Sequence, residues 1–213
     1  PVGDREALLL HLRKLTFGDR MSCILDCPQC ETKLDIDLHV SDLLLPPYAQ
    51  PAYWFRIPLP AEKLLVTFRL PTGADQEAVA DLASHDPRNA AAAILERCLH
   101  SVSRDGVTLE AIPNELPHSL LEPIAAFMAE HDPQAELLLH NECPACAHPF
   151  NVLLDMRQYL AEEINQRLRY LYREVHLLAW YYHWSEADIL QMTRPHRKIY
   201  LDLLDETLSE VAP

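Results

Sequence analysis

The chain has 213 residues, 49% of them hydrophobic and 23% charged, which is the composition of a globular protein with a core of its own. Its formal net charge of −14 repels a phosphate backbone unless basic residues gather on one face, so general nucleic-acid binding is disfavoured. The four glycines are too scattered for the loops that bind nucleotides. We find no secretory leader and no apolar run long enough to cross a bilayer. We therefore expect a cytoplasmic protein without a membrane segment, and Pro1 as the start of the ordered part of a longer chain.

Residues 1–20 are expected to form one amphipathic helix that packs on its leucine side. The leucines recur at steps of three and four, and Gly18 ends the helix. Strict alternation of apolar and polar residues over 32–40 then predicts a half-buried strand, which belongs to a hairpin over residues 21–40. The helix positions expected to pack are Leu8, Leu9, Leu12 and Leu15.

Residues 41–135 are expected to form a proline-rich connector and a largely helical insertion. The stretch 45–60 holds five prolines, too many for regular structure, and we interpret it as a connector lying over a surface. Residues 64–70 are β-like. Three helices are predicted after them, near residues 75–84, 91–99 and 119–130.

Residues 136–154 regain strand character and are expected to form a second hairpin. Residues 155–213 predict a module of three helices, the first of them long because its apolar positions recur at steps of three or four. Ser185 and Thr193 mark the starts of the other two helices. The fold class predicted is α+β. The apolar stripe of the long helix is Met156, Leu160, Ile164, Leu168, Leu171, Val175, Leu178 and Tyr182.

Two Cys-Pro-x-Cys pairs, Cys27 with Cys30 and Cys143 with Cys146, are the strongest chemical signal in the sequence. Two thiolates on one tight turn can point at one ion, and two such turns complete the tetrahedral four-sulphur shell that structural zinc prefers. We therefore predict one structural Zn²⁺ in a zinc-ribbon-like pair of hairpins. Compact ribbons have about 15 to 20 residues between the pairs, so the ribbon here must accommodate the whole insertion.

Two other uses of the pairs remain open, namely reduced structural thiols and a redox or disulfide role. Thioredoxin-like chemistry needs its Cys-x-x-Cys at a helix start, whereas strand patterns follow both pairs here. Cys23 and Cys98 lie outside the pairs and are expected to be buried small hydrophobic residues.

Nothing in the sequence identifies a catalytic centre. His176 and His183 are seven residues apart, a spacing that ordinary residues at the edge of a helical core also show. The sequence contains no His-Glu-x-x-His zinc-protease motif and no Gly-x-Ser-x-Gly nucleophile turn. We therefore expect a protein that is not an enzyme.

Aromatic residues crowd the end of the long helix, where we predict a partner-binding surface formed by Trp180, Tyr181 and Trp184. Packing of the three-helix tail on itself is the alternative explanation. A local basic patch leaves a helix-turn-helix interpretation open, although the net charge disfavours it. The patch consists of Arg194, His196, Arg197 and Lys198.

Eight short segments spread over nearly the whole chain resemble one protein family in their residues and order. They are residues 5–13, the first cysteine pair with 34–38, then 68–72, 95–98, 129–135, 143–148, 173–179 and 184–190. The family looks like the baseplate or tail-assembly proteins of extracellular contractile injection systems, distantly similar to T-even phage baseplate proteins. The resemblance transfers no catalytic residue.

The resemblance implies a structural or assembly component of a contractile phage-tail-like injection particle. Its expected partners are other subunits of the particle, in the baseplate, tube or sheath, and the protein is expected to be cytoplasmic or incorporated into the assembled particle. The alternative is a zinc-ribbon nucleic-acid-binding regulator. A third possibility is an enzyme with an unrecognised site.

Overall fold

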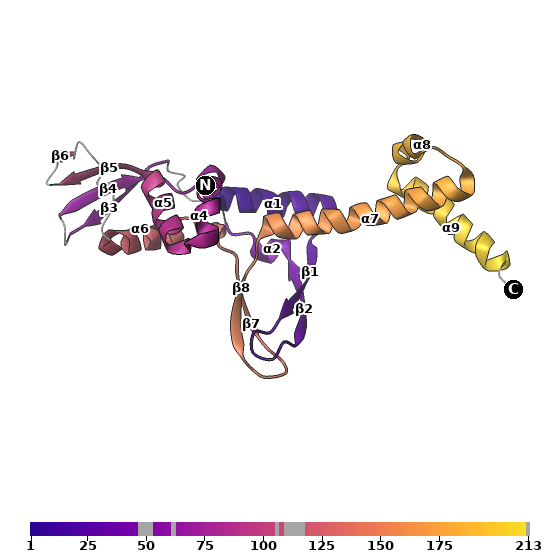
Figure 1. Cartoon of the computed structure of the whole chain (residues 1–213), viewed down its shortest axis with the longest axis horizontal. Helices are drawn as coiled ribbons and strands as arrows, with labels where there is room; N and C mark the ends of the chain where they lie inside the picture. Colours follow the sequence, from indigo (N-terminus) through magenta and orange to yellow (C-terminus); the bar gives the residue numbers. More distant parts are fainter. Residues whose placement is uncertain (47–52, 61–62, 105–106, 109–117, 212–213) are drawn as a thin grey trace. The chain divides into compact units, whose positions relative to one another are not determined.

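The structure, a computed structural model, describes residues 1–46, 53–60, 63–104, 107–108 and 118–211. Its class is α+β, as predicted, with small antiparallel sheets, helices and a C-terminal helical module (Figure 1). The chain divides into two compact units, residues 1–157 and residues 158–213. No helix in the described ranges is long and apolar enough to cross a membrane.

The first turn of helix α1 (Val2–Phe17) is hydrogen-bonded to two segments that are distant in the sequence. The Val2 N–H donates to the Pro71 carbonyl at 2.9 Å, and the Gly3 N–H donates to the Asp132 carboxylate at 3.0 Å. A Cβ on Gly3 would lie 1.9 Å from that carboxylate, so the close approach requires glycine. The carboxylate also satisfies a terminal N–H and interacts favourably with the helix dipole.

The predicted packing face of α1 was wrong. Leu8, Leu12 and Leu15 are 67%, 52% and 87% exposed, whereas Leu10 is fully buried. The buried positions recur at helical spacing, but on the side that carries charged residues as well as apolar ones. They are Val2, Gly3, Glu6, Leu10 and Arg13.

Two buried charges on α1 explain why hydrophobicity alone selected the wrong face. The Arg5 guanidinium donates to the Glu6 carboxylate at 2.7 Å, and Arg13 donates to the Gly18 carbonyl at 2.6 Å. Buried charged groups are tolerated when they have hydrogen-bonding partners of this kind. The spacing of the leucines gives no information about these partners, so it could not predict the buried face.

Two antiparallel hairpins of the first unit lie side by side (Figure 1). One pairs β1 (Arg20–Asp26) with β2 (Lys33–His39), and the other pairs β7 (Leu138–Glu142) with β8 (Pro149–Leu153). Their inner faces share a small cluster whose buried residues are Cys27, Leu34 and Cys143, with Ile36 and Phe150 packed against it.

Short elements join the hairpins to the rest of the unit. After β2 comes α2 (Val40–Leu43), and the turn η1 (Pro133–Ala135) precedes β7. The buried Gln134 side chain connects the two, because it donates to the Leu43 carbonyl at 3.1 Å and accepts from the Leu45 N–H at 2.7 Å.

The insertion contains a four-stranded antiparallel sheet, for which the sequence predicted only one β-like stretch. Its order is β3-β4-β5-β6. The interpretation of residues 45–60 as irregular was wrong for β3, which tolerates Pro58 because it is an edge strand, where a missing N–H costs little. The strands are β3 (Phe55–Leu59), β4 (Leu64–Phe68), β5 (Leu99–Arg104) and β6 (Val107–Thr108).

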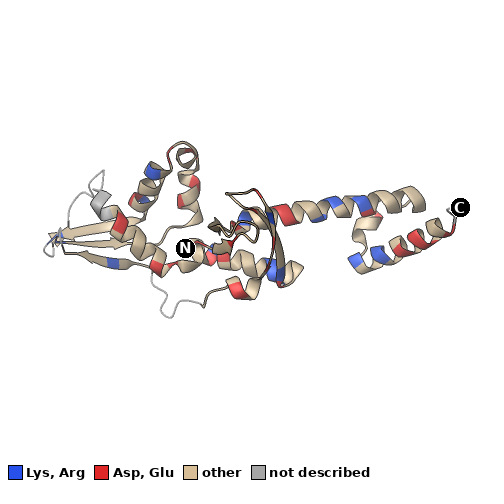
Figure 2. Cartoon of the chain, turned by 90° about the horizontal axis from the view of Figure 1, so that it is seen from below, with Lys and Arg blue, Asp and Glu red and all other residues tan. Residues whose placement is uncertain are grey.

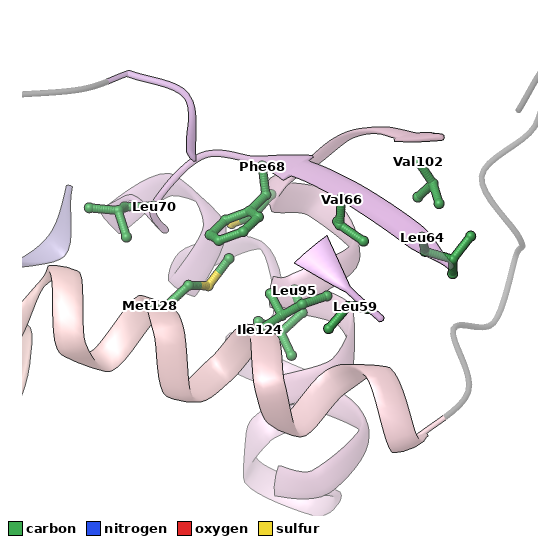
Figure 3. Packing of buried hydrophobic residues seen from close by; sticks show 10 residues of the cluster. Leu59, Leu64, Val66, Phe68, Leu70, Leu95, Val102, Ile124 and Met128 are labelled. Atoms are coloured by element: carbon green, nitrogen blue, oxygen red, sulfur yellow. The ribbon is translucent and has the colours of Figure 1, made fainter. Parts of the chain in front are cut away.

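Four helices accompany this sheet, in the regions where helices were predicted, and two of them build the core of the insertion. Figure 3 shows residues of β4 facing residues of α5 and α6 across that core. The helices are α3 (Gly73–Ala78), α4 (Ala80–His85), α5 (Pro87–Cys98) and α6 (His118–His131). The buried cluster consists of Leu59, Leu64, Val66, Phe68, Leu70, Leu95, Cys98, Val102, Ile124 and Met128.

A buried carboxylate connects the end of β4 to α3 and α5. Asp75 is 1% exposed and accepts from the Arg69 guanidinium at 2.6 and 2.9 Å and from Arg97 Nε at 3.2 Å. The Thr72 hydroxyl and N–H also donate to it, at 2.7 and 3.0 Å, and the bond from the N–H is one of the two that make up the capping box of α3. The Arg69 guanidinium holds the pKa of Asp75 well below its ordinary value.

The second unit is a three-helix module, as predicted, and it has a core of its own. Its helices are α7 (Met156–Tyr182), whose first two residues belong to the first unit, α8 (Glu186–Gln191) and α9 (Arg194–Val211). The Asp188 N–H donates to the Ser185 hydroxyl at 3.2 Å and caps α8. The core consists of Val175, Leu178 and Ile189, with Leu171, Ala179, Tyr182, Trp184, Tyr200 and Leu201 packed against it.

Candidate metal centre

The four paired cysteines come together between the two hairpins. Their sulphur atoms all lie within 4.8 Å of one another. The Sγ of Cys27 lies 3.7 Å from that of Cys146, and the Sγ of Cys30 lies 3.6 Å from that of Cys143. The structure therefore assembles the four residues that the sequence predicted as ligands into one cluster.

The two turns that carry the cysteines repeat the same backbone hydrogen bonds. The Cys27 N–H donates to the Thr32 carbonyl at 3.0 Å, and the Cys143 N–H donates to the His148 carbonyl at 3.0 Å. Within each turn, the N–H of the residue after the second cysteine donates to the carbonyl of the first cysteine, at 2.9 and 2.8 Å. Each hairpin thus presents its two sulphurs from an equivalent turn.

Both turns depend on a left-handed residue directly after the second cysteine. Glu31 has φ 59° and Ala147 has φ 56°. This conformation costs a residue with a side chain roughly 1–2 kcal/mol. Sequence reasoning missed both positions, because glycine is the usual signal for a left-handed turn and neither position carries it.

Burial is divided in the same way in both pairs. Cys27 and Cys143 are each 1% exposed, whereas Cys30 and Cys146 are exposed. The buried sulphur of each pair lies close to the exposed sulphur of the other pair. Two sulphurs therefore rest on the apolar cluster between the hairpins while the other two face the surface.

The spacing of the sulphurs fits one tetrahedral ion. A metal–sulphur distance near 2.3 Å places the corners of a tetrahedron roughly 3.8 Å apart. The two closest pairs differ from that separation by only a little, whereas a disulfide would bring two sulphurs to about 2.05 Å. All four cysteines are free, so the donor set could bind a metal ion.

The acidity of the thiols shows what a cation would change. Hydrogen bonds from the Thr32 hydroxyl and backbone lower the pKa of Cys30 to about 6. The His148 backbone lowers the pKa of Cys146, but removal from water and the neighbouring sulphurs outweigh it and raise this pKa to about 12. Contact with the neighbouring sulphurs thus makes ionisation of Cys146 less favourable, and a bound cation would favour its thiolate form.

The remaining candidate ligands do not join this cluster. Cys98 is fully buried in the core of the insertion, where burial raises the pKa of its thiol to about 11, and Cys23 is half-buried. His176 and His183 are exposed. Over the described ranges, no other group of three or more Cys, His, Asp or Glu side chains has the geometry to hold a metal ion.

The predicted docking aromatics have different surroundings. Trp180 is 67% exposed and Tyr181 is 43% exposed. Trp184 instead packs into the core of the module. The centroid of its ring lies 4.7 Å from the ring centroid of Tyr182 and 4.7 Å from that of Tyr200. The structure therefore leaves two of the three residues accessible to a partner.

The predicted basic patch is divided as well. Arg197 is 9% exposed and donates to the Glu174 carboxylate at 3.0 Å and to the Met192 carbonyl at 2.7 Å. Arg194, His196 and Lys198 are exposed. One of the four residues is therefore structural and cannot contact a phosphate.

Comparison with known proteins identifies the family of the chain. No curated protein and no solved structure matches it. A family model described as T4 bacteriophage base plate protein matches residues 1–160, well over half of the 213 residues. The match includes both hairpins and all four clustered cysteines, and it ends near the start of α7. The chain therefore belongs to the T4 bacteriophage base plate protein family.

Proposed function

We propose that this protein is a structural or assembly component of the baseplate of a contractile phage-tail-like injection particle. The family match over residues 1–160 is the observation that carries the proposal. A structural role is supported by the donor set. Among the described residues, the one cluster that could hold a metal ion consists of four cysteines between the hairpins. With four protein ligands, a tetrahedral ion keeps no open position for water or substrate.

We assign the metal as one structural zinc per chain. Four thiolates are soft ligands, and a tetrahedral four-sulphur shell suits zinc. The small apolar cluster between the hairpins leaves much of their association to the ion. In this role the zinc would hold the two hairpins together and would take no part in chemistry.

The surface proposed for docking other particle subunits is the end of α7, at Trp180 and Tyr181. Large exposed aromatic side chains are common anchors in protein interfaces and reduce the solubility of a free surface. Trp180 is 67% exposed although it lies next to a well-packed core. These residues lie outside the matched range, so the docking role rests on their exposure alone.

The experiment is co-expression of the protein with the baseplate, tube and sheath proteins of the same particle, followed by capture on a tag. Capture of one of these subunits is expected. Trp180→Ala with Tyr181→Ala should weaken it on the order of 30-fold, because an anchoring tryptophan typically contributes about 2 kcal/mol or more. The metal content should not change.

Tyr170→Ala is the matched control, since Tyr170 lies on the same helix and is also 67% exposed. It should leave capture unchanged. Full capture by the double variant would contradict the docking surface. Salt-dependent binding of an oligonucleotide, with no particle subunit captured, would contradict the baseplate role.

A further inference from the structure

The last helix, α9, separates its charges along its length. Exposed basic residues occupy its first turns, and exposed acidic residues occupy the part that follows. Figure 2 shows blue at the start of this helix and red toward the C-terminus. The basic residues are Arg194 and Lys198, and the acidic ones are Asp202, Asp205, Glu206 and Glu210.

This arrangement is unfavourable for the helix by itself. A helix prefers acidic side chains at its N-terminus and basic side chains at its C-terminus, the reverse of what α9 has. Asp202, Glu206 and Glu210 also follow one another at steps of four, a spacing at which like charges repel. Among the described residues, none of the six exposed charges of α9 takes part in an ion pair. These exposed charges are therefore accessible to a partner.

An apolar contact lies at the middle of the charge pattern. Ile199 and Leu203 are 57% and 47% exposed and stand one turn apart, so their side chains share a face. Arg197 and Leu204, which are buried, lie on the other side of the helix, against the module. The exposed pair is thus directed away from the core of the module.

The charged residues form a row beside this pair. Arg194, Lys198, Asp202 and Asp205 follow one another at steps of four, four and three, which places them along one side of the helix. The row changes sign between Lys198 and Asp202, next to Ile199 and Leu203. A second helix with the same row matches it when the two run antiparallel, because each basic half then meets an acidic half.

We propose that α9 binds α9 of a second copy of this chain, antiparallel and around a two-fold axis near Leu201. Ile199 of each copy then packs against Leu203 of the other copy, and Arg194 and Lys198 approach the acidic half of the other helix. A parallel arrangement would place like charges together. The contact is isologous, so it closes at two copies.

The pair should be weak and sensitive to salt. Two helices of 18 residues have less to bury than a standard interface, which takes about 1,200–2,000 Å². Much of the attraction comes from exposed charges, which salt screens. The proposal is separate from the docking role of Trp180 and Tyr181, which lie on α7, so failure of one leaves the other intact.

The test is sedimentation equilibrium of the full chain at rising protein concentration, in low and in high salt. The unmodified protein should dimerise as its concentration rises, and high salt should shift this transition to higher concentration. Two charge variants sharpen the test, one with Arg194→Glu and Lys198→Glu, the other with Asp202→Lys and Asp205→Lys. Each should be monomeric alone, and an equimolar mixture should form a heterodimer.

Leu203→Ser should weaken the dimer at least tenfold. Leu15→Ser, at a leucine of α1 that is more exposed than Leu203 (87% against 47%), should leave it unchanged. All substituted side chains are exposed, and unchanged circular dichroism checks that each variant folds. A protein that stays monomeric at every concentration, a mixture that does not recover the dimer, or a dimer that keeps its strength in both charge variants would overturn the proposal.

Discussion

The hairpin pair and the insertion are held together in different ways although they belong to the same unit. The insertion buries ten residues between a sheet and two helices (Figure 3). The hairpins bury three residues in common, and two of these are cysteines of the sulphur cluster. A small apolar cluster cannot offset the cost of ordering two hairpins from distant parts of the chain. If the sulphur cluster binds the proposed ion, the association of the hairpins should depend on that ion, whereas the insertion should be stable without it.

Removing one ligand should produce the largest effect and should confine it to the hairpins. Cys143→Ser is expected to abolish metal binding and to separate the hairpins, because structural zinc contributes on the order of 10–16 kcal/mol in zinc-finger peptides. Hydrogen exchange should become fast in β1, β2, β7 and β8 while β4 and β5 remain protected. Equal protection of the hairpins in both proteins would contradict the comparison.

Truncation of Phe68, the largest fully buried side chain of the insertion, should instead destabilise the insertion and leave the hairpins unaffected. Phe68→Ala is expected to destabilise the insertion by about 3–5 kcal/mol, because it removes a ring at the centre of the core. Chemical denaturation monitored in β4 and β5 measures this loss, and the zinc content should stay the same. Loss of zinc in this variant would mean that the two regions are not energetically separate.

Cys98→Ser provides a control for both experiments. Cys98 lies in the core of the insertion and outside the sulphur cluster. The variant should keep its metal and lose only part of the stability of the insertion, since a buried hydroxyl replaces a small apolar group.

Asp75→Asn should weaken the insertion in a manner that depends on pH. The Arg69 guanidinium lowers the pKa of Asp75 in the folded protein, so the ionised carboxylate stabilises the fold. This contribution is fully present above the unfolded pKa of about 3.9 and is lost as the pH falls toward the folded value. Breaking a buried pair costs about 3–5 kcal/mol, so the variant should be less stable by that order at pH 7.

Denaturation of both proteins between pH 7 and pH 2 measures this effect. The difference in their free energies of unfolding should be constant near neutral pH and shrink below about pH 4. A difference that does not change down to pH 2 would show that the charge of Asp75 does not contribute.

The smallest effect concerns the turns that carry the clustered cysteines. Ala147→Gly is expected to raise the stability of the hairpins by up to about 1 kcal/mol, because glycine adopts positive φ without strain. The gain is limited because glycine also has more conformational freedom in the unfolded chain. Ala145→Gly in the same turn is the control, since only the residue after the second cysteine is left-handed there. It should be neutral or destabilising in zinc-loaded thermal unfolding. A stabilising Ala145→Gly would contradict the role of the backbone conformation.

The cluster of four cysteines was more predictable from the sequence than its surroundings. Two Cys-Pro-x-Cys turns carry their ligand spacing within four residues, so the pairs are recognisable without knowledge of the fold. Alternation over 32–40 likewise predicted β2, because one face of it covers the buried cluster. The long helix and the start of α8 were predictable from periodicity and from Ser185 as a cap.

The remaining features depend on contacts that a local pattern does not contain. The buried face of α1 follows from partners of Glu6 and Arg13, and β3 becomes a strand because β4 pairs with it. Trp184 and Trp180 look alike in the sequence, yet the turn after α7 directs Trp184 onto Tyr200. Tertiary contacts decided each of these cases.

Elemental analysis decides whether the two hairpins share one structural zinc. Freshly purified protein kept under reducing conditions should contain one zinc per chain, and Cys27→Ser prepared in the same way should contain none, since no pair alone completes the shell. Absence of zinc from the unmodified protein, or half an equivalent retained after Cys27→Ser, would contradict the shared site.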